Sequence, residues 1–134
     1  MTRKSVGRFP GSIPGLLALG IAMLVMAPVA GAATINVTVT DDEFNPTGAG
    51  CSLRGAITAA QTNAPFAGCP AGSGADTIRL GDGTFRITRP GSGEDGNATG
   101  DFDVTGADPL TIEPADVSAR VVIDGNGLDR VFHQ

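Results

Sequence analysis

The chain contains no tryptophan and no tyrosine, and only six phenylalanines and one histidine occur among its 134 residues. Few side chains are therefore present that could stack on sugar rings. Basic residues are also scarce, because 14 acids outnumber nine Lys and Arg, and three of those nine lie in the first eight residues. Nucleic acids and anionic lipids both attract clusters of cations, so neither is expected as a partner. This length fits one domain at most.

The one long apolar run lies near the N-terminus, at residues 16–29. Three basic residues precede it and the small residues 30–33 follow it, which is the order of a secretory signal peptide. The run is shorter than the roughly 20 residues that a spanning helix needs, so a retained anchor is the less favoured alternative. We predict a signal peptide at residues 1–33, cleaved after Ala32 or Ala33. The protein would then be secreted or displayed at the cell surface through the general export route, and would meet a membrane only during export.

The chain has two cysteines, Cys51 and Cys69, and a single histidine, His133. Four zinc ligands cannot be assembled from these residues alone, and the closely spaced cysteine pair of a redox motif is missing. In an oxidising compartment a lone pair of cysteines usually forms a disulfide, which would stabilise the fold by about 3 kcal/mol. We predict a Cys51–Cys69 bridge, with two buried thiols as the alternative.

Local patterns predict one strand and one helix in the first part of the exported chain. Residues 34–40 alternate between apolar and β-branched polar side chains, which favours a half-buried strand. Residues 52–61 carry apolar side chains on one helical face, and Ser52 is placed to cap the N-terminus. Gly55 stands where a capping box would have Glu or Gln, so this helix depends on packing and on the adjacent bridge.

Short strands dominate the rest of the chain. Residues 76–80 and 84–88 alternate around a Gly-Asp-Gly turn, so they form either a tight hairpin or two strands joined by a sharp corner. Residues 89–100 read as a loop rich in turn residues and acids. Further short apolar segments lie at 102–104, 110–112, 121–123 and 131–132. A sandwich would have longer strands and a more aromatic core, so the pattern favours a parallel β-solenoid.

Residues 51–57 read Cys-Ser-Leu-Arg-Gly-Ala-Ile, and this stretch resembles the Cys-Ser-Leu-Arg-Glu-Ala motif of the CSLREA domain. The resemblance continues in order through residues 68–80, 94–95, 99–103 and 122–132. Gly55 departs from the family motif, which has Glu at that position. The resemblance implies an N-terminal module of exported bacterial proteins that precedes a right-handed parallel β-helix.

On this resemblance, residues 34–134 form the cap and first coil or coils of a right-handed parallel β-helix, with one short capping helix. The resemblance implies a non-catalytic structural or interaction module of a secreted or cell-surface protein, for which an adhesin-like role is the expectation. Its partners would be downstream coils or a surface ligand. The sequence stops shortly after a new strand begins at Val131, so we expect either a fragment of a longer protein or a small free-standing cap.

The acids between residues 94 and 103 are the only candidate metal ligands. The opening of a calcium-binding loop is matched by Asp95, Asn97, Thr99 and Gly100. However, Gly106 occupies the position of the bidentate Glu and no helices flank the segment, which excludes an EF-hand. A looser calcium site would use the four acids of this segment. These are Glu94, Asp95, Asp101 and Asp103. Solvated loop acids are the favoured alternative, and no other cofactor is expected.

No catalytic constellation emerges from the residues. Paired carboxylates could act on polysaccharides, but the sequence does not show that they converge. Arg79 and Arg86 are expected on the solvent face of their strands, and His133 has no catalytic partner at a familiar spacing. We therefore predict no enzyme in this segment. Two alternatives remain: a polysaccharide-acting β-helix enzyme whose active site lies beyond residue 134, and a calcium-stabilised binding module.

Overall fold

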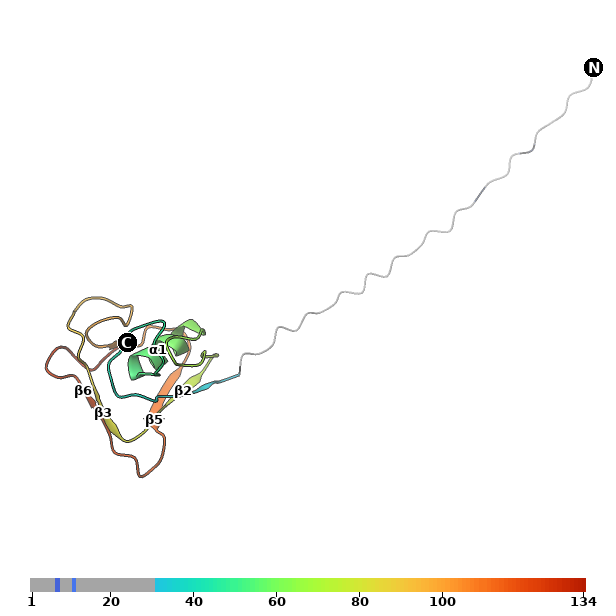
Figure 1. The fold of residues 1–134 in the computed structure, drawn as a ribbon. Helices are drawn as coiled ribbons and strands as arrows, with labels where there is room; N and C mark the ends of the chain where they lie inside the picture. Colours follow the sequence, from blue (N-terminus) through green and yellow to red (C-terminus); the bar gives the residue numbers. More distant parts are fainter. Residues whose placement is uncertain (1–6, 8–10, 12–30) are drawn as a thin grey trace, which may run out of the picture.

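The computed structural model describes residue 7, residue 11 and residues 31–134. The predicted signal peptide therefore lies almost entirely outside the described residues. The described part is mainly β with one short helix, which confirms that aspect of the predicted fold class. Within it, no helix is long and apolar enough to cross a bilayer. The elements are β1 (Thr34–Asn36), α1 (Leu53–Thr62), β2 (Asp76–Leu80), β3 (Gly83–Arg86), β4 (Phe102–Asp103), β5 (Leu110–Pro114), β6 (Val121–Asp124) and β7 (Phe132–His133) (Figure 1).

All strand pairing between these elements is parallel. Strand β2 lies between β1 and β5, strand β3 pairs with β6, and strand β4 pairs with β7. A first strand set (β2, β3, β4) therefore lies beside a second strand set (β5, β6, β7) in the same order. In Figure 1, β2 and β5 lie along one side of the molecule, and β3 and β6 along another.

The turn between β2 and β3 is a corner and not a hairpin. The two strands belong to different sheets, so the hairpin alternative is wrong and the corner alternative is confirmed. Gly83 at this corner has a φ of 151°, a backbone conformation that glycine adopts readily and other residues rarely do. The chain can therefore change direction between two short strands without steric strain.

The core lies between the first strand set, β1 and the helix. Ile35 and Ile78 are neighbours in register across β1 and β2, and both are fully buried. Helix α1 contacts β1, β2 and β4, and it buries Leu53 and Ile57 as the sequence pattern predicts. Burial of each such aliphatic side chain contributes about 1.5–3 kcal/mol, and this packing stabilises a helix of only ten residues.

Helix α1 begins where its predicted N-cap places it, and it ends one residue beyond the predicted range 52–61. The Ser52 hydroxyl accepts a 3.0 Å hydrogen bond from the backbone N–H of Gly55, so the predicted N-cap is confirmed. Asn63 ends the helix in a left-handed conformation, and its N–H bonds back to the last turn. A β-carbon at position 55 would lie 3.3 Å from Sγ of Cys69, so glycine here lets the helix start close to the bridge.

The structure joins Cys51 to Cys69 in a buried disulfide, as the sequence predicts. A buried disulfide is compatible with an extracellular protein. Strand β1 ends at Asn36 and is therefore shorter than the strand predicted at residues 34–40, because Thr38 bonds to Cys51 and not to a neighbouring strand. The backbone N–H of Thr38 donates to the carbonyl of Cys51, and the Thr38 hydroxyl accepts from the backbone N–H of Cys51.

Candidate functional site

A buried arginine in the first turn of α1 organises the polar interior. The Arg54 side chain is fully buried, and its Nε and Nη2 groups donate to the two carboxylate oxygens of Asp42, whose side chain is 1% exposed. Such a pair is costly to desolvate and needs further hydrogen bonds to satisfy its remaining donors. The loop that follows β3 supplies them.

Three backbone carbonyls of that loop accept from Arg54. Its Nη1 group donates to the carbonyls of Asn97 at 3.2 Å and Asp101 at 3.0 Å, and its Nη2 group donates to Gly100 at 2.7 Å. The guanidinium also lies 4.8 Å from the ring centre of Phe102. Arg54 therefore ties the helix to a segment more than forty positions away along the chain.

Asn97 completes the attachment of the loop. Its backbone has a left-handed φ of 58°, and its side-chain amide donates to the carbonyl of Arg54 at 2.9 Å and to the hydroxyl of Thr58 at 3.0 Å. Its backbone N–H donates to Oδ2 of Asp103 at 3.0 Å. The loop predicted at residues 89–100 is thus irregular, as expected, but it is anchored by buried polar groups.

The four acids proposed for calcium do not all converge. Glu94 accepts hydrogen bonds from the backbone N–H groups of Gly96, Ala98 and Thr99. Desolvation opposes its ionisation, but these hydrogen bonds outweigh it and hold the pKa of Glu94 below its ordinary value of 4.5. Glu94 therefore stabilises its own turn.

Asp101 is also engaged elsewhere. Its buried carboxylate accepts from Nε of Arg130, and this hydrogen bond raises the pKa of Arg130 above its ordinary value. Asp101 and Asp103 are both buried, so the expectation that these acids are solvated is wrong for these two. Asp95 is exposed, as that expectation has it.

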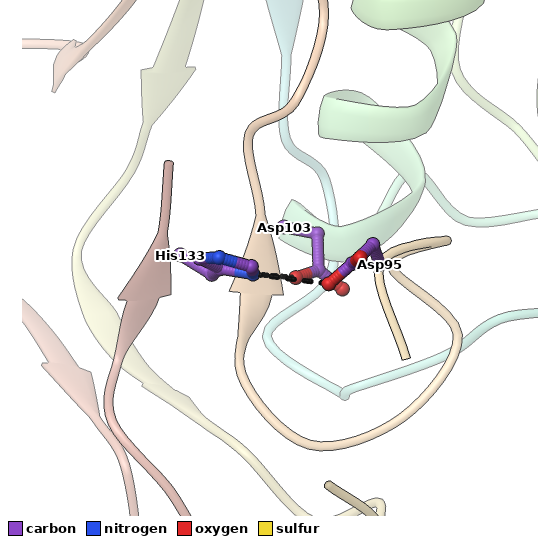
Figure 2. Close-up of side chains that lie close together, drawn as sticks. All are labelled: Asp95, Asp103 and His133. Carbon is purple, nitrogen blue, oxygen red and sulfur yellow. Dashed lines mark hydrogen bonds and ion pairs between the residues drawn. The ribbon is translucent and has the colours of Figure 1, made fainter. Parts of the chain in front are cut away.

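The remaining two acids meet the only histidine of the chain. Asp95 comes from the loop, Asp103 from β4 and His133 from β7, and their side chains point toward one another (Figure 2). Nδ1 of His133 lies 3.1 Å from Oδ1 of Asp103 and 3.3 Å from Oδ1 of Asp95. The sequence offered no partner for His133, and the structure places it beside these two carboxylates. Three potential metal-ligand atoms lie within 4.8 Å of one another in this carboxylate–histidine cluster.

A second feature is an open apolar groove on the second strand set. It is lined by Val104, Leu110, Ile112, Ile123, Phe132 and Gln134. Inward-facing side chains of β5, β6 and β7 are less buried than those of the strands with which they pair, β2, β3 and β4. Ile112 and Ile123 are half-buried, whereas Ile78 and Phe85, their partners in register on the first set, are buried.

Arg79 and Arg86 lie on the solvent face, as predicted. Their side chains are 46% and 55% exposed, and each pairs with an acid directly beside it on the neighbouring strand. Arg79 bonds to Glu113 and Arg86 bonds to Asp124. Exposed pairs of this kind contribute about 0–1 kcal/mol each, and they favour the observed strand register.

Sequence reasoning missed two features of this region. It assigned no role to Arg54, although a basic residue between two apolar helix positions, with acids upstream, was a usable signal. It also missed the meeting of Asp95, Asp103 and His133, which depends on the pairing of β4 with β7. No family model, curated protein or solved structure matches the chain.

Proposed function

We propose that this chain is a non-catalytic structural module of the CSLREA type that caps one end of an exported parallel β-helix. In this proposal a signal peptide directs export, and the helix α1 and its disulfide cover one end of the strand stack. The opposite end, formed by the second strand set, receives a further layer of parallel strands. The protein acts in the secreted or surface-displayed state.

The unequal burial of paired strands carries this proposal. Inward-facing residues of β2, β3 and β4 are covered by the second strand set, whereas the same register positions on β5, β6 and β7 are only half-covered. The sheets are parallel and ordered alike, which is how successive coils of a solenoid stack. Strands with a free edge also present unpaired N–H and C=O groups that another strand can satisfy.

Four charged side chains outside the carboxylate–histidine cluster are engaged in structural contacts, which supports a structural role over a catalytic one. Arg54, Asp42 and Asp101 are occupied by buried contacts that hold the loop on the helix. Glu94 is occupied by backbone N–H groups of its own turn. Groups engaged in this way stabilise the fold, and they are not free to transfer protons to a substrate.

Hydrogen exchange of the exported full chain tests the proposal. In dilute solution we expect amides of β5, β6 and β7 to exchange faster than those of β2, β3 and β4. At high concentration the open edge should pair with another copy, so that the sedimentation coefficient rises and exchange in the second strand set slows. Equal protection of both sets in a monomer would contradict the proposal, because the second set would then need no cover.

Two lysine substitutions locate the associating surface. Ile123→Lys places a charge in the apolar groove and should reduce association. Val117→Lys places the same charge on a fully exposed side chain outside the groove, so it serves as the matched control. Circular dichroism establishes that both variants are folded. Equal association of the two variants would place the contact elsewhere and would count against the groove.

A further inference from the structure

The carboxylate–histidine cluster presents two oxygen ligands and one nitrogen ligand at the protein surface. Asp103 is buried, His133 is 31% exposed and Asp95 is 72% exposed, so the cluster opens to solvent on one side. We propose that it binds one divalent transition-metal ion of the zinc class. Three protein ligands with a fourth position open to water are a known arrangement for zinc.

The distances fit a small tetrahedral ion. Zinc bonds to nitrogen and oxygen are about 2.0–2.1 Å long, so neighbouring ligand atoms of a tetrahedron are about 3.3 Å apart. Nδ1 of His133 lies 3.1 Å and 3.3 Å from the two facing carboxylate oxygens. All three ligand atoms lie within 4.8 Å of one another. The two carboxylate oxygens would have to approach each other to reach the tetrahedral distance, and the exposed loop residue Asp95 can make this movement.

Asp103 provides a second, independent feature. Its side chain is fully buried, and its Oδ1 atom points into the cluster (Figure 2). Among the described residues, Oδ1 has no hydrogen-bond partner other than His133. The other oxygen, Oδ2, is fixed by the backbone N–H of Asn97 at 3.0 Å. Hydrogen bonds of this kind orient the ligands of metal sites from outside the coordination sphere.

The ligand chemistry favours zinc over calcium. Calcium takes six to eight oxygen ligands, whereas here the nearby carboxylates of Glu94 and Asp101 bond to other groups. An imidazole nitrogen suits zinc and its neighbours in the transition series. Two carboxylates and a neutral imidazole carry two negative charges, which one divalent ion neutralises. The ion would also link β4 to β7 and to the loop.

Calorimetric titration of the untagged, exported full chain with Zn²⁺, and in parallel with Ca²⁺, tests the site. We expect one Zn²⁺ per chain, a melting temperature that rises with Zn²⁺ and falls again with chelator, and calcium affinity at least about tenfold weaker. The chain has one histidine, so the ¹⁵N-histidine spectrum reports on His133 alone. Zn²⁺ should shift its Nδ1 resonance.

Matched variants separate this site from general attraction to a negatively charged protein. Asp95→Asn alters an exposed side chain, so the fold is retained, and it should weaken zinc binding at least about tenfold. Asp41→Asn removes the same charge from another exposed aspartate and should leave binding unchanged. Absence of saturable zinc binding, equal zinc affinity of the two variants, or tighter binding of calcium than of zinc would each overturn the proposal.

A different observation concerns the first described residues of the exported part. The carboxylate of Asp76 is buried, and its Oδ1 atom accepts a 2.8 Å hydrogen bond from the backbone N–H of Ala33. The backbone N–H of Ser73 lies 2.9 Å from Oδ1 and 3.0 Å from Oδ2 of the same carboxylate. Among the described residues, no Lys, Arg or His side chain forms an ion pair with it. A buried carboxylate without a counter-charge is unfavourable.

We infer that the leader is removed between Ala32 and Ala33, and that the new α-ammonium group is the counter-charge of Asp76. This inference rests on the proposed export. Hydrolysis by a leader peptidase adds water across the peptide bond, leaving a carboxylate on Ala32 and an ammonium on Ala33. Residues 30–32 read Ala-Gly-Ala, the pattern that such peptidases recognise. Cleavage one residue later would remove Ala33, whose carbonyl also accepts from Thr77 N–H at 2.9 Å.

The intact mass of the exported product tests this inference. A product that begins at Ala33 is expected. A product that begins at Thr34 would overturn the inference and leave the proposed export standing, whereas a retained leader would contradict both. Deletion of Ala33, or the variant Asp76→Asn, should lower the melting temperature by at least about 4 °C, whereas Asp41→Asn should not. Unchanged melting temperatures of the first two variants would overturn the role of Asp76.

Discussion

Substitution of the buried Arg54 by methionine tests the polar interior most directly. Methionine keeps much of the side-chain length but removes every donor. Asp42 then loses its only cationic partner in the described structure, and the carbonyls of Gly100 and Asp101 lose their shared donor. Removing one partner of a buried ion pair costs about 3–5 kcal/mol. Backbone N–H groups of Thr88 and Arg89 still bond to Asp42, which favours the lower end of that range.

This loss is large relative to the stability of a small domain, which is about 5–15 kcal/mol. At about 4 °C or more per kcal/mol, the melting temperature should fall by at least about 12 °C. The free energy of unfolding is best measured by denaturant titration with far-UV circular dichroism, because the chain has no tryptophan or tyrosine to report by fluorescence. Arg79→Met is the matched control, since it breaks an exposed pair worth about 0–1 kcal/mol. Equal losses in the two variants would refute the reasoning.

Three further predictions concern the cap and its loop. Replacing Cys51 and Cys69 by alanine should cost about 3 kcal/mol in denaturant titrations, and a loss under 1 kcal/mol would contradict the loop-closure argument. The folded-state pKa of Glu94 is lowered, so its contribution is present above pH 4.5 and is lost as the pH falls through the lower folded value. Glu94→Gln should therefore be less stable than the wild type near neutral pH and equal to it in acid, whereas a pH-independent difference would count against this. Gly72→Ala should lower the free energy of unfolding by about 1–3 kcal/mol, because the new β-carbon would lie 2.6 Å from the Ala60 Cα. The control Gly81→Ala places a β-carbon with no atom within 4 Å and should leave the free energy of unfolding unchanged in the same titration.

Features that depend on neighbouring residues could be predicted from the sequence. Helix α1 follows from the spacing of its apolar side chains and from Ser52, both of which act within a few residues. Strand β2 has the predicted bounds because its alternation is complete between two turns. Strand β1 is shorter than predicted because the alternation continues to Thr40, whereas Thr38 bonds to Cys51 and not to a neighbouring strand. That contact joins distant residues, and no local pattern encodes it.

The candidate site was only half predictable for the same reason. Its acids were visible as a cluster in the sequence, but which of them face His133 depends on contacts with other segments. Arg130 engages Asp101 and backbone N–H groups engage Glu94, which leaves Asp95 and Asp103. His133 reaches them because β7 pairs in register with β4. The partner of a short strand is set by packing of the whole stack, so its side-chain neighbours cannot be deduced from spacing.

The two proposed surfaces meet on β7, and this placement links them physically. Successive side chains of a strand point to opposite faces. Phe132 packs against Phe102, with ring centres 5.7 Å apart, and lines the apolar groove, whereas His133 enters the carboxylate–histidine cluster. A strand of two residues has few hydrogen bonds of its own to hold it in place. An ion bound by His133 would fix β7 against β4 and thereby hold Phe132 in the groove. Metal binding would therefore order the edge on which a further layer of strands is proposed to pair.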